Sequence, residues 1–107
     1  MAETNPTTGI LALEGEIDLH RSDEIKETLR PLIDQKTQRI LIDLSGVNYI
    51  DSAGLAVFIE TLQRVKSYGG RFAVFGLRES VRSIFEIARL DQVFQIFPDE
   101  AAAQASA

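Results

Sequence analysis

Apolar residues fall into four short runs along the chain, and each run has the pattern of a β-strand. In residues 10–19, ILALEGEIDL, apolar and polar positions alternate, which predicts a half-buried strand with a bend at Gly15. Residues 39–44, RILIDL, and 71–77, RFAVFGL, are almost continuously apolar, as strands covered on both faces are. The run VFQIF at 93–97 predicts a last strand.

Between these runs the apolar positions recur with the 3.6-residue period of a helix. One apolar stripe starts just after Ser52 and stops before a Gly-Gly pair, which is a strong helix stop. The first helix is expected to begin at Ser22, since acidic residues follow it, and Pro31 should kink or shorten that helix. His20 is then a loop residue before the helix, and the segment SGVNYI is expected to be a loop as well. The predicted helices span 22–35, 52–68 and 79–89.

Strands and helices alternate along the chain, which implies crossover connections and a mainly parallel sheet. We therefore predict a single α/β domain over residues 1–107, with a four- to five-stranded, mixed but mostly parallel sheet and three to four helices. Its globular part covers about residues 9–98 between two flexible ends, of which the C-terminal one can form a short helix. In such folds the functional edge is where strand ends lead into helices, and the Asp51-Ser52 junction lies on that edge.

Composition narrows the classes of function. The 107 residues carry a net charge of -5, which argues against nucleic acid and anionic membrane as partners. There is no cysteine and only one histidine, so we expect no thiolate chemistry, no metal site and no cofactor. The first residues lack the features of a secretory signal, and no apolar stretch is long enough for a membrane span. We expect a cytoplasmic protein.

The Asp51-Ser52 pair admits three interpretations, of which the first is a helix cap. Both side chains can accept hydrogen bonds from the first N–H groups of a helix. The second interpretation is a serine nucleophile on a strand-to-helix turn, as in the elbow motif G-x-S-x-G. Gly54 fits the second glycine of that motif, but Ile50 stands at the first, and His20 precedes the serine, whereas that family places its histidine last. We therefore expect no catalytic residue in this chain.

In the third interpretation Ser52 is itself a substrate. A serine in the first turn of a helix lies beside free N–H groups and the positive end of the helix dipole, which suit a phosphoryl group. The small residues Ala53 and Gly54 leave room for the active site of a partner. A phosphate there would change the local potential strongly, because Asp51, and Asp18 if it lies nearby, already carry negative charge. This interpretation is compatible with a cap, since Asp51 can cap the helix while Ser52 points outward.

The chain resembles STAS domains, and in particular the single-domain anti-sigma factor antagonists. The resemblance runs from about Ile10 to Phe97 and covers nearly the whole globular part. It is specific because DLSGV and IDSAGL occur together at this distance from GEIDL, whereas DSAGL alone would be a weaker sign. The matching pieces are GEIDL (15–19), LIDLSGVNYIDSAGLAVFIE (41–60), RVKSYGGRFAVFGL (64–77) and VRSIFEIARLDQVFQIF (81–97).

The resemblance implies a switch that exchanges partners. In the family, an anti-sigma factor that is also a GHKL-type serine kinase binds the unphosphorylated antagonist and releases the sigma factor. Phosphorylation of the serine after the motif's aspartate ends this binding, and a PP2C-type phosphatase restores the hydroxyl. Ser52 matches the phosphorylated serine, and Asp18 matches the acidic position of GEIDL that faces a basic residue of the kinase. The residues expected to bind the partner are Asp18, Asp51, Ser52, Ala53, Gly54 and Leu55. We expect the free chain to be a monomer.

A runner-up and two departures accompany this resemblance. STAS modules that do not switch by phosphorylation, such as scaffolds of signalling assemblies or small subunits of lipid-transport complexes, share similar motifs. Residues 1–8 leave room for an initial edge strand of only two to four residues, where relatives often have a full strand. Arg89 stands where relatives often have a glycine after the third helix, so that helix is expected to end differently.

Overall fold

Four parallel strands form one sheet, in the order β1-β2-β3-β4. The computed structural model describes residues 8–106, so the short edge strand expected within residues 1–8 lies outside the described part except for Thr8. Every strand pairing in that part is parallel, and the four strands are the lower end of the expected range. The elements are β1 (Thr8–Ile17), α1 (Leu19–Asp34), β2 (Arg39–Ile50), α2 (Ser52–Ser67), β3 (Arg71–Phe75), α3 (Glu79–Ile87), the 3-10 turn η1 (Leu90–Gln92), β4 (Gln95–Phe97) and α4 (Glu100–Ala105).

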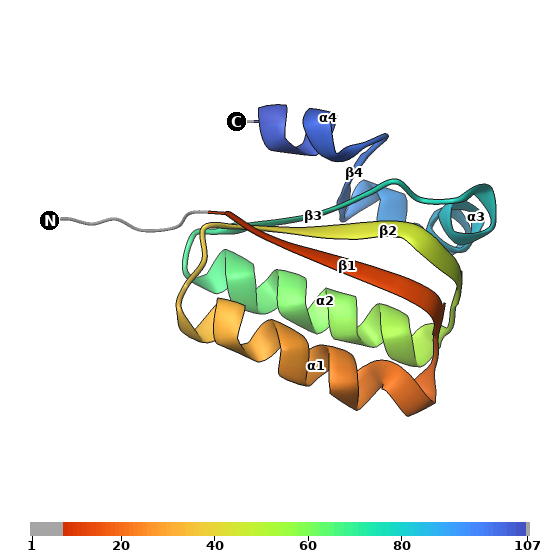
Figure 1. The fold of residues 1–107 in the computed structure, drawn as a ribbon, viewed down its shortest axis with the longest axis horizontal. Helices are drawn as coiled ribbons and strands as arrows, with labels where there is room; N and C mark the ends of the chain where they lie inside the picture. Colours follow the sequence, from red (N-terminus) through yellow and green to blue (C-terminus); the bar gives the residue numbers. More distant parts are fainter. Residues whose placement is uncertain (1–7, 107) are drawn as a thin grey trace, which may run out of the picture.

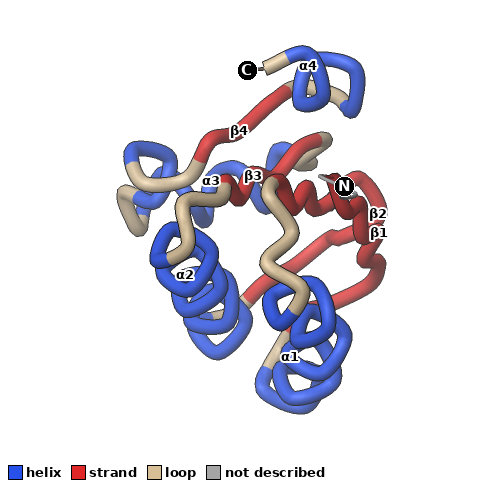
Figure 2. Tube along the Cα trace, turned by 90° about the vertical axis from the view of Figure 1, so that its left-hand side faces the viewer, coloured by secondary structure: helices blue, strands red, loops and turns tan. Residues whose placement is uncertain are grey.

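The helices lie in unequal layers on the two faces of the sheet. Figure 1 shows α1 and α2 side by side along one face, and Figure 2 shows α4 alone on the opposite side. The main core fills the space between the sheet and the longer helices, with Phe58 and Phe85 among its fully buried side chains. A second, smaller apolar cluster lies on the α4 side and consists of Leu41, Ala73, Phe75 and Ala103, with Phe97 packed against it.

The first helix begins three residues earlier than the sequence indicated. Helix α1 starts at Leu19, and its N-cap is Asp18, whose carboxylate accepts the N–H of His20 at 3.0 Å. The expectation that Ser22 starts the helix and that His20 lies in a loop was therefore wrong. Ser22 is buried in the first turn, where its hydroxyl donates to the carbonyl of Leu19. Pro31 does not shorten the helix, which continues to Asp34.

The segment SGVNYI, expected to be a loop, continues strand β2 to Ile50. It pairs with the second half of β1, and two register irregularities, between Ala12 and Glu14 and between Gly15 and Glu16, let the two long strands remain paired. Gly15, where a bend was expected, stays within β1 and has φ +81° at the second of these irregularities, a left-handed conformation that glycine adopts without a steric penalty. Because β2 stays paired to its last residue, it leads directly into Asp51 and the start of α2.

Candidate functional site

Ser52 is the first residue of α2 and is exposed to solvent. The chain enters the helix through Asp51, which has extended backbone angles and whose Oδ1 accepts the N–H of Gly54 at 3.0 Å. This is the hydrogen bond of an N-cap, so the cap interpretation of Asp51 is confirmed. The side chain that caps α2 is therefore that of Asp51, and the hydroxyl of Ser52 is left for another role.

The same carboxylate also holds the start of α1. Its other oxygen, Oδ2, accepts the N–H of Leu19 at 3.2 Å, and the backbone N–H of Asp51 donates to the carbonyl of Ile17 at 3.0 Å. One side chain thus joins the first turns of two helices that are far apart in the sequence. The sequence does not predict this link, because nothing in the pattern shows that the two strand ends lie side by side.

Gly54 allows the two strand-to-helix junctions to approach closely. A Cβ atom at this position would lie 2.7 Å from Ile17 Cγ2 and 2.8 Å from Ile50 Cγ1, both shorter than real contacts allow. Gly54 is buried, whereas Ala53 and Leu55 are partly exposed. The small size of Gly54 therefore serves packing inside the molecule, and its place among the partner-binding residues stays a prediction.

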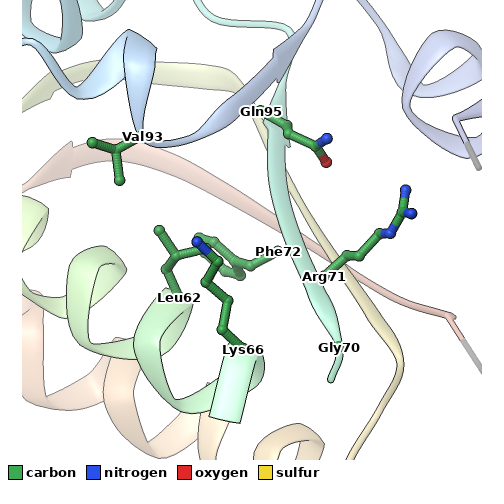
Figure 3. A pocket seen from close by; sticks show the side chains of 7 residues that line it. All are labelled: Leu62, Lys66, Gly70, Arg71, Phe72, Val93 and Gln95. Atoms are coloured by element: carbon green, nitrogen blue, oxygen red, sulfur yellow. The ribbon is translucent and has the colours of Figure 1, made fainter. Parts of the chain in front are cut away.

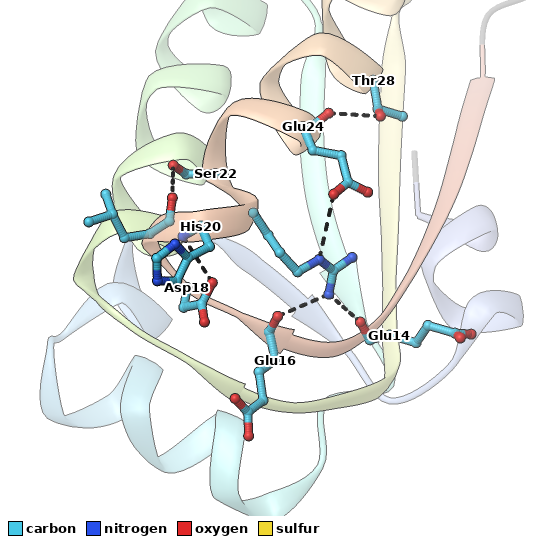
Figure 4. A network of polar contacts seen from close by, with 9 residues as sticks. Glu14, Glu16, Asp18, His20, Ser22, Glu24 and Thr28 are labelled. Atoms are coloured by element: carbon cyan, nitrogen blue, oxygen red, sulfur yellow. Dashed lines mark hydrogen bonds and ion pairs between the residues drawn. The ribbon is translucent and has the colours of Figure 1, made fainter.

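Asp18 lies at the neighbouring strand end and is partly exposed. Asp18 also caps α1. Three positions later, the guanidinium of Arg21 turns back toward β1 and donates to the carbonyls of Glu14 and Glu16, the latter at 2.9 Å (Figure 4). Arg21 is thereby held against β1, and Nε lies 4.0 Å from the carboxylate of Glu24. The carboxylates of Asp18 and Asp51 thus stand at the starts of two helices that the Asp51–Leu19 bond connects.

A serine nucleophile would need a base bonded to its hydroxyl. His20 is exposed in the first turn of α1, and no hydrogen bond recorded for residues 8–106 joins its ring to Ser52. Within the same residues there is no group of three or more side chains that could hold a metal ion, and no helix long and apolar enough to cross a membrane. Among residues 8–106, the structure thus places an exposed hydroxyl at the start of a helix.

A hollow of about 200 Å³ lies at the opposite end of α2. Leu62, Lys66 and Phe72 are among its lining residues, as Figure 3 shows. Lys66 follows Ser52 by fourteen residues in α2, which corresponds to about 21 Å along the helix axis. This hollow is therefore separate from the site around Ser52.

The sequence matches the STAS domain family over residues 1–103. The anti-sigma-B factor antagonist of Bacillus subtilis strain 168 is 36% identical over 84 residues, which are 78% of this chain and 76% of that protein. An anti-sigma factor antagonist from Mycobacterium paratuberculosis has a similar fold, with a TM-score of 0.84, 22% identity, and coverage of 95% of this chain and 86% of that one. The phosphorylated form of the Bacillus cell fate determinant SpoIIAA gives a TM-score of 0.72 at 19% identity, covering 95% of this chain and 92% of that one.

Proposed function

The chain belongs to the STAS domain family, and we propose that it is an anti-sigma factor antagonist that works by exchanging partners. In this proposal the unphosphorylated chain binds an anti-sigma factor that is a GHKL-type serine kinase, and the sigma factor is released. The proposal is supported by the 36% identity to the anti-sigma-B factor antagonist of Bacillus subtilis. In this proposal the exchange of partners takes place in the cytoplasm.

Ser52 is the residue that we propose as the phosphorylation site. Its exposed position at the start of α2 supports this role, because a kinase active site can reach it and the helix start accommodates negative charge. The Ser52 hydroxyl oxygen attacks the γ-phosphorus of ATP, the bond to the ADP oxygen breaks, and the hydroxyl proton passes to a base of the kinase. This chain contributes only the acceptor, and a PP2C-type phosphatase hydrolyses the phosphoserine.

Phosphorylation would release the kinase by blocking the interface rather than by changing the fold. The phosphate adds about 1.5 to 2 negative charges at neutral pH. It would stand next to Asp51, and at a docked interface it has neither room nor water to compensate its charge. Because about 1.4 kcal/mol corresponds to a tenfold change in affinity, a penalty of a few kcal/mol is enough for release.

The test is to incubate the purified chain with ATP and each GHKL-type kinase encoded in its own genome. We expect one kinase to add a single phosphoryl group to the peptide that contains Ser52, as measured by mass spectrometry. Ser52→Ala should abolish the reaction, whereas Ser80→Ala should not, although Ser80 is also an exposed serine in the first turn of a helix. Ser80 is thus a matched control.

Binding measurements on the same kinase complete the test. Ser52→Ala should bind as tightly as the unmodified chain, and Ser52→Asp should fold normally but bind poorly. If no kinase modifies or binds the chain, the proposal is wrong, and the runner-up, a STAS scaffold or lipid-transport subunit without a phosphorylation switch, takes its place.

A further inference from the structure

A groove separates the N-terminal halves of α1 and α2 and opens next to Ser52. It has a volume of about 290 Å³, and the two helices that form it lie side by side in Figures 1 and 2. Its walls come from the first two turns of α1 and from the helix face that follows Ser52 in α2. The lining residues that matter here are Leu19, Asp23, Lys26, Ala53, Ala56 and Glu60.

The groove is apolar at the end nearest Ser52. The side chain of Leu19 is 67% exposed, and among the large apolar side chains of residues 8–106 only that of Ile87 is more exposed, at 84%. On α2, the wall positions Ala53 and Ala56 each carry only a methyl group. The groove exists because these two side chains are small. The centres of protein–protein interfaces are typically formed by apolar side chains that fill pockets, and an exposed leucine beside this groove fits that pattern.

The charges around the groove favour a basic partner. Lys26 is already paired with Glu60 across the groove at 3.9 Å, and Arg21 is held against β1 by two carbonyls. Asp23 is exposed, and among residues 8–106 no ion pair includes it. The charge that the groove leaves for a partner to meet is therefore the negative charge of Asp23.

The groove is fixed relative to the phosphorylation site. The backbone of Leu19 donates to the carboxylate of Asp51, and Asp51 also caps the helix that begins at Ser52. A partner that binds Leu19 and the groove therefore receives Ser52 at a set position. Holding a reacting group in place in this way is what raises the effective concentration of a substrate at an active site.

We propose that the groove is a docking site for the anti-sigma kinase, separate from the phosphorylated serine; this inference rests on the proposed function. The occupant is a bulky apolar side chain of the kinase, which fills the space over Ala53 and Ala56, next to a lysine or arginine that meets Asp23. Docking determines how tightly the kinase holds this chain, and the hydroxyl of Ser52 determines only whether phosphate is transferred.

The experiment uses the kinase that phosphorylates Ser52 and three variants of the full chain. Leu19→Ser removes the exposed apolar side chain, Ala56→Leu fills the groove, and Asp23→Lys reverses its charge. Ile87→Ser is the matched control, since it removes an even more exposed apolar side chain from α3, a helix that does not line the groove. All four positions are exposed, so the variants should fold, which circular dichroism verifies.

Each groove variant should weaken kinase binding about tenfold or more, as expected for losing a buried apolar side chain or a charge contact. The KM for phosphorylation should rise by a similar factor while kcat changes less than about twofold, because the reacting hydroxyl is intact. Ile87→Ser should leave both constants unchanged. If Leu19→Ser and Ala56→Leu bind the kinase as tightly as the unmodified chain or more tightly, the groove is not a docking site, although the proposed function stands. If the unmodified chain neither binds any of the kinases nor accepts phosphate from one, the proposed function itself has failed.

Discussion

The carboxylate of Asp51 accepts a hydrogen bond from the N–H of Leu19, thirty-two positions earlier in the sequence, at 3.2 Å. Its other oxygen accepts the N–H of Gly54 at 3.0 Å. The starts of α1 and α2 are therefore held by one aspartate side chain, directly before the serine that we propose as the phosphorylation site. The sequence pattern assigns Asp51 to the start of α2 only, whereas its side chain bonds to the starts of both helices.

Removing this carboxylate should destabilise the fold more than removal of an ordinary cap. Asp51→Ala leaves two N–H groups without their partner and should lower the free energy of unfolding by about 2 kcal/mol, the upper end for an N-cap. Asp51→Asn should cost less, because its amide oxygen can still accept one of the two bonds. Urea unfolding followed by circular dichroism measures both variants. An alanine variant as stable as the original would show that the two bonds contribute nothing.

Gly54→Ala should be destabilising although alanine is the better helix former. The added methyl group would lie 2.7 Å from Ile17 and 2.8 Å from Ile50, so one of the junctions must move. Overpacking of this kind costs about 1–3 kcal/mol of unfolding free energy. A double-mutant cycle with Ile17→Ala locates the cause, because the pair should be less destabilised than the sum of the two single variants. Strict additivity would contradict the clash.

Asp18 needs a conservative variant to separate its two roles. Asp18→Lys removes the N-cap of α1 as well as the charge, so it should lower the thermal midpoint together with any kinase affinity. Asp18→Asn keeps an oxygen for the N–H of His20 and removes only the charge. Its unfolding free energy should stay within about 0.5 kcal/mol of the original, because asparagine caps helices as well as aspartate does. Kinase affinity should still fall, and unchanged affinity would remove the Asp18 charge from the interface.

Tyr68 should give the fold a dependence on alkaline pH. Its hydroxyl donates to the carbonyl of Thr37 at 2.8 Å, and burial raises its pKa above the usual value of 10.0. The folded state therefore favours the protonated phenol, so this contribution is complete below pH 10 and is lost as the pH rises through the folded-state pKa. Tyr68→Phe should lose about 1 kcal/mol at neutral pH, the value of one hydrogen bond. The difference in unfolding free energy between Tyr68→Phe and the original should shrink above pH 10, and a difference that stays constant there would contradict this account.

Arg89→Gly should stabilise the protein. Arg89 follows the end of α3 with φ +61°, a left-handed conformation that glycine adopts without a steric penalty. The gain should be about 0.5–1 kcal/mol, since relief of the left-handed strain exceeds the extra entropy that glycine brings to the unfolded chain. Arg82→Gly, at an exposed position inside the same helix, should be destabilising by about 1 kcal/mol. If both substitutions changed the free energy of unfolding equally, the left-handed φ of Arg89 would not be the cause.

The sequence was most informative where periodicity and a cap signal agreed. The apolar stripe after Ser52 and the aspartate before it placed the start of α2 at the correct residue. The start of α1 was misplaced, because Asp18 and Ser22 are both good caps, and the choice between them depends on where β1 ends. Arg89 shows a third case, in which α3 ends in a left-handed turn that a glycine would have signalled, but with an arginine in its place.

What could not be predicted depends on strand register. The segment SGVNYI has the loop-forming residues Ser45 and Gly46, yet it pairs with β1 through two irregularities that leave no mark in the alternation of apolar residues. The contact of Asp51 with Leu19 and the groove beside it exist only because these paired strands end together. Candidate residues could therefore be named from the motif, but their connections could not.

The position of Arg21 has a consequence for how the protein behaves at high concentration. Among the described residues β1 pairs with β2 alone, so its other edge offers backbone groups to a neighbouring molecule. Arg21 occupies the carbonyls of Glu14 and Glu16 on that strand, where the register irregularities also interrupt its regular hydrogen-bonding row. An edge interrupted in this way is a poor template for a strand from another chain. The Arg21 side chain thus protects this part of the sheet from edge-to-edge aggregation, next to the strand end that leads into α1.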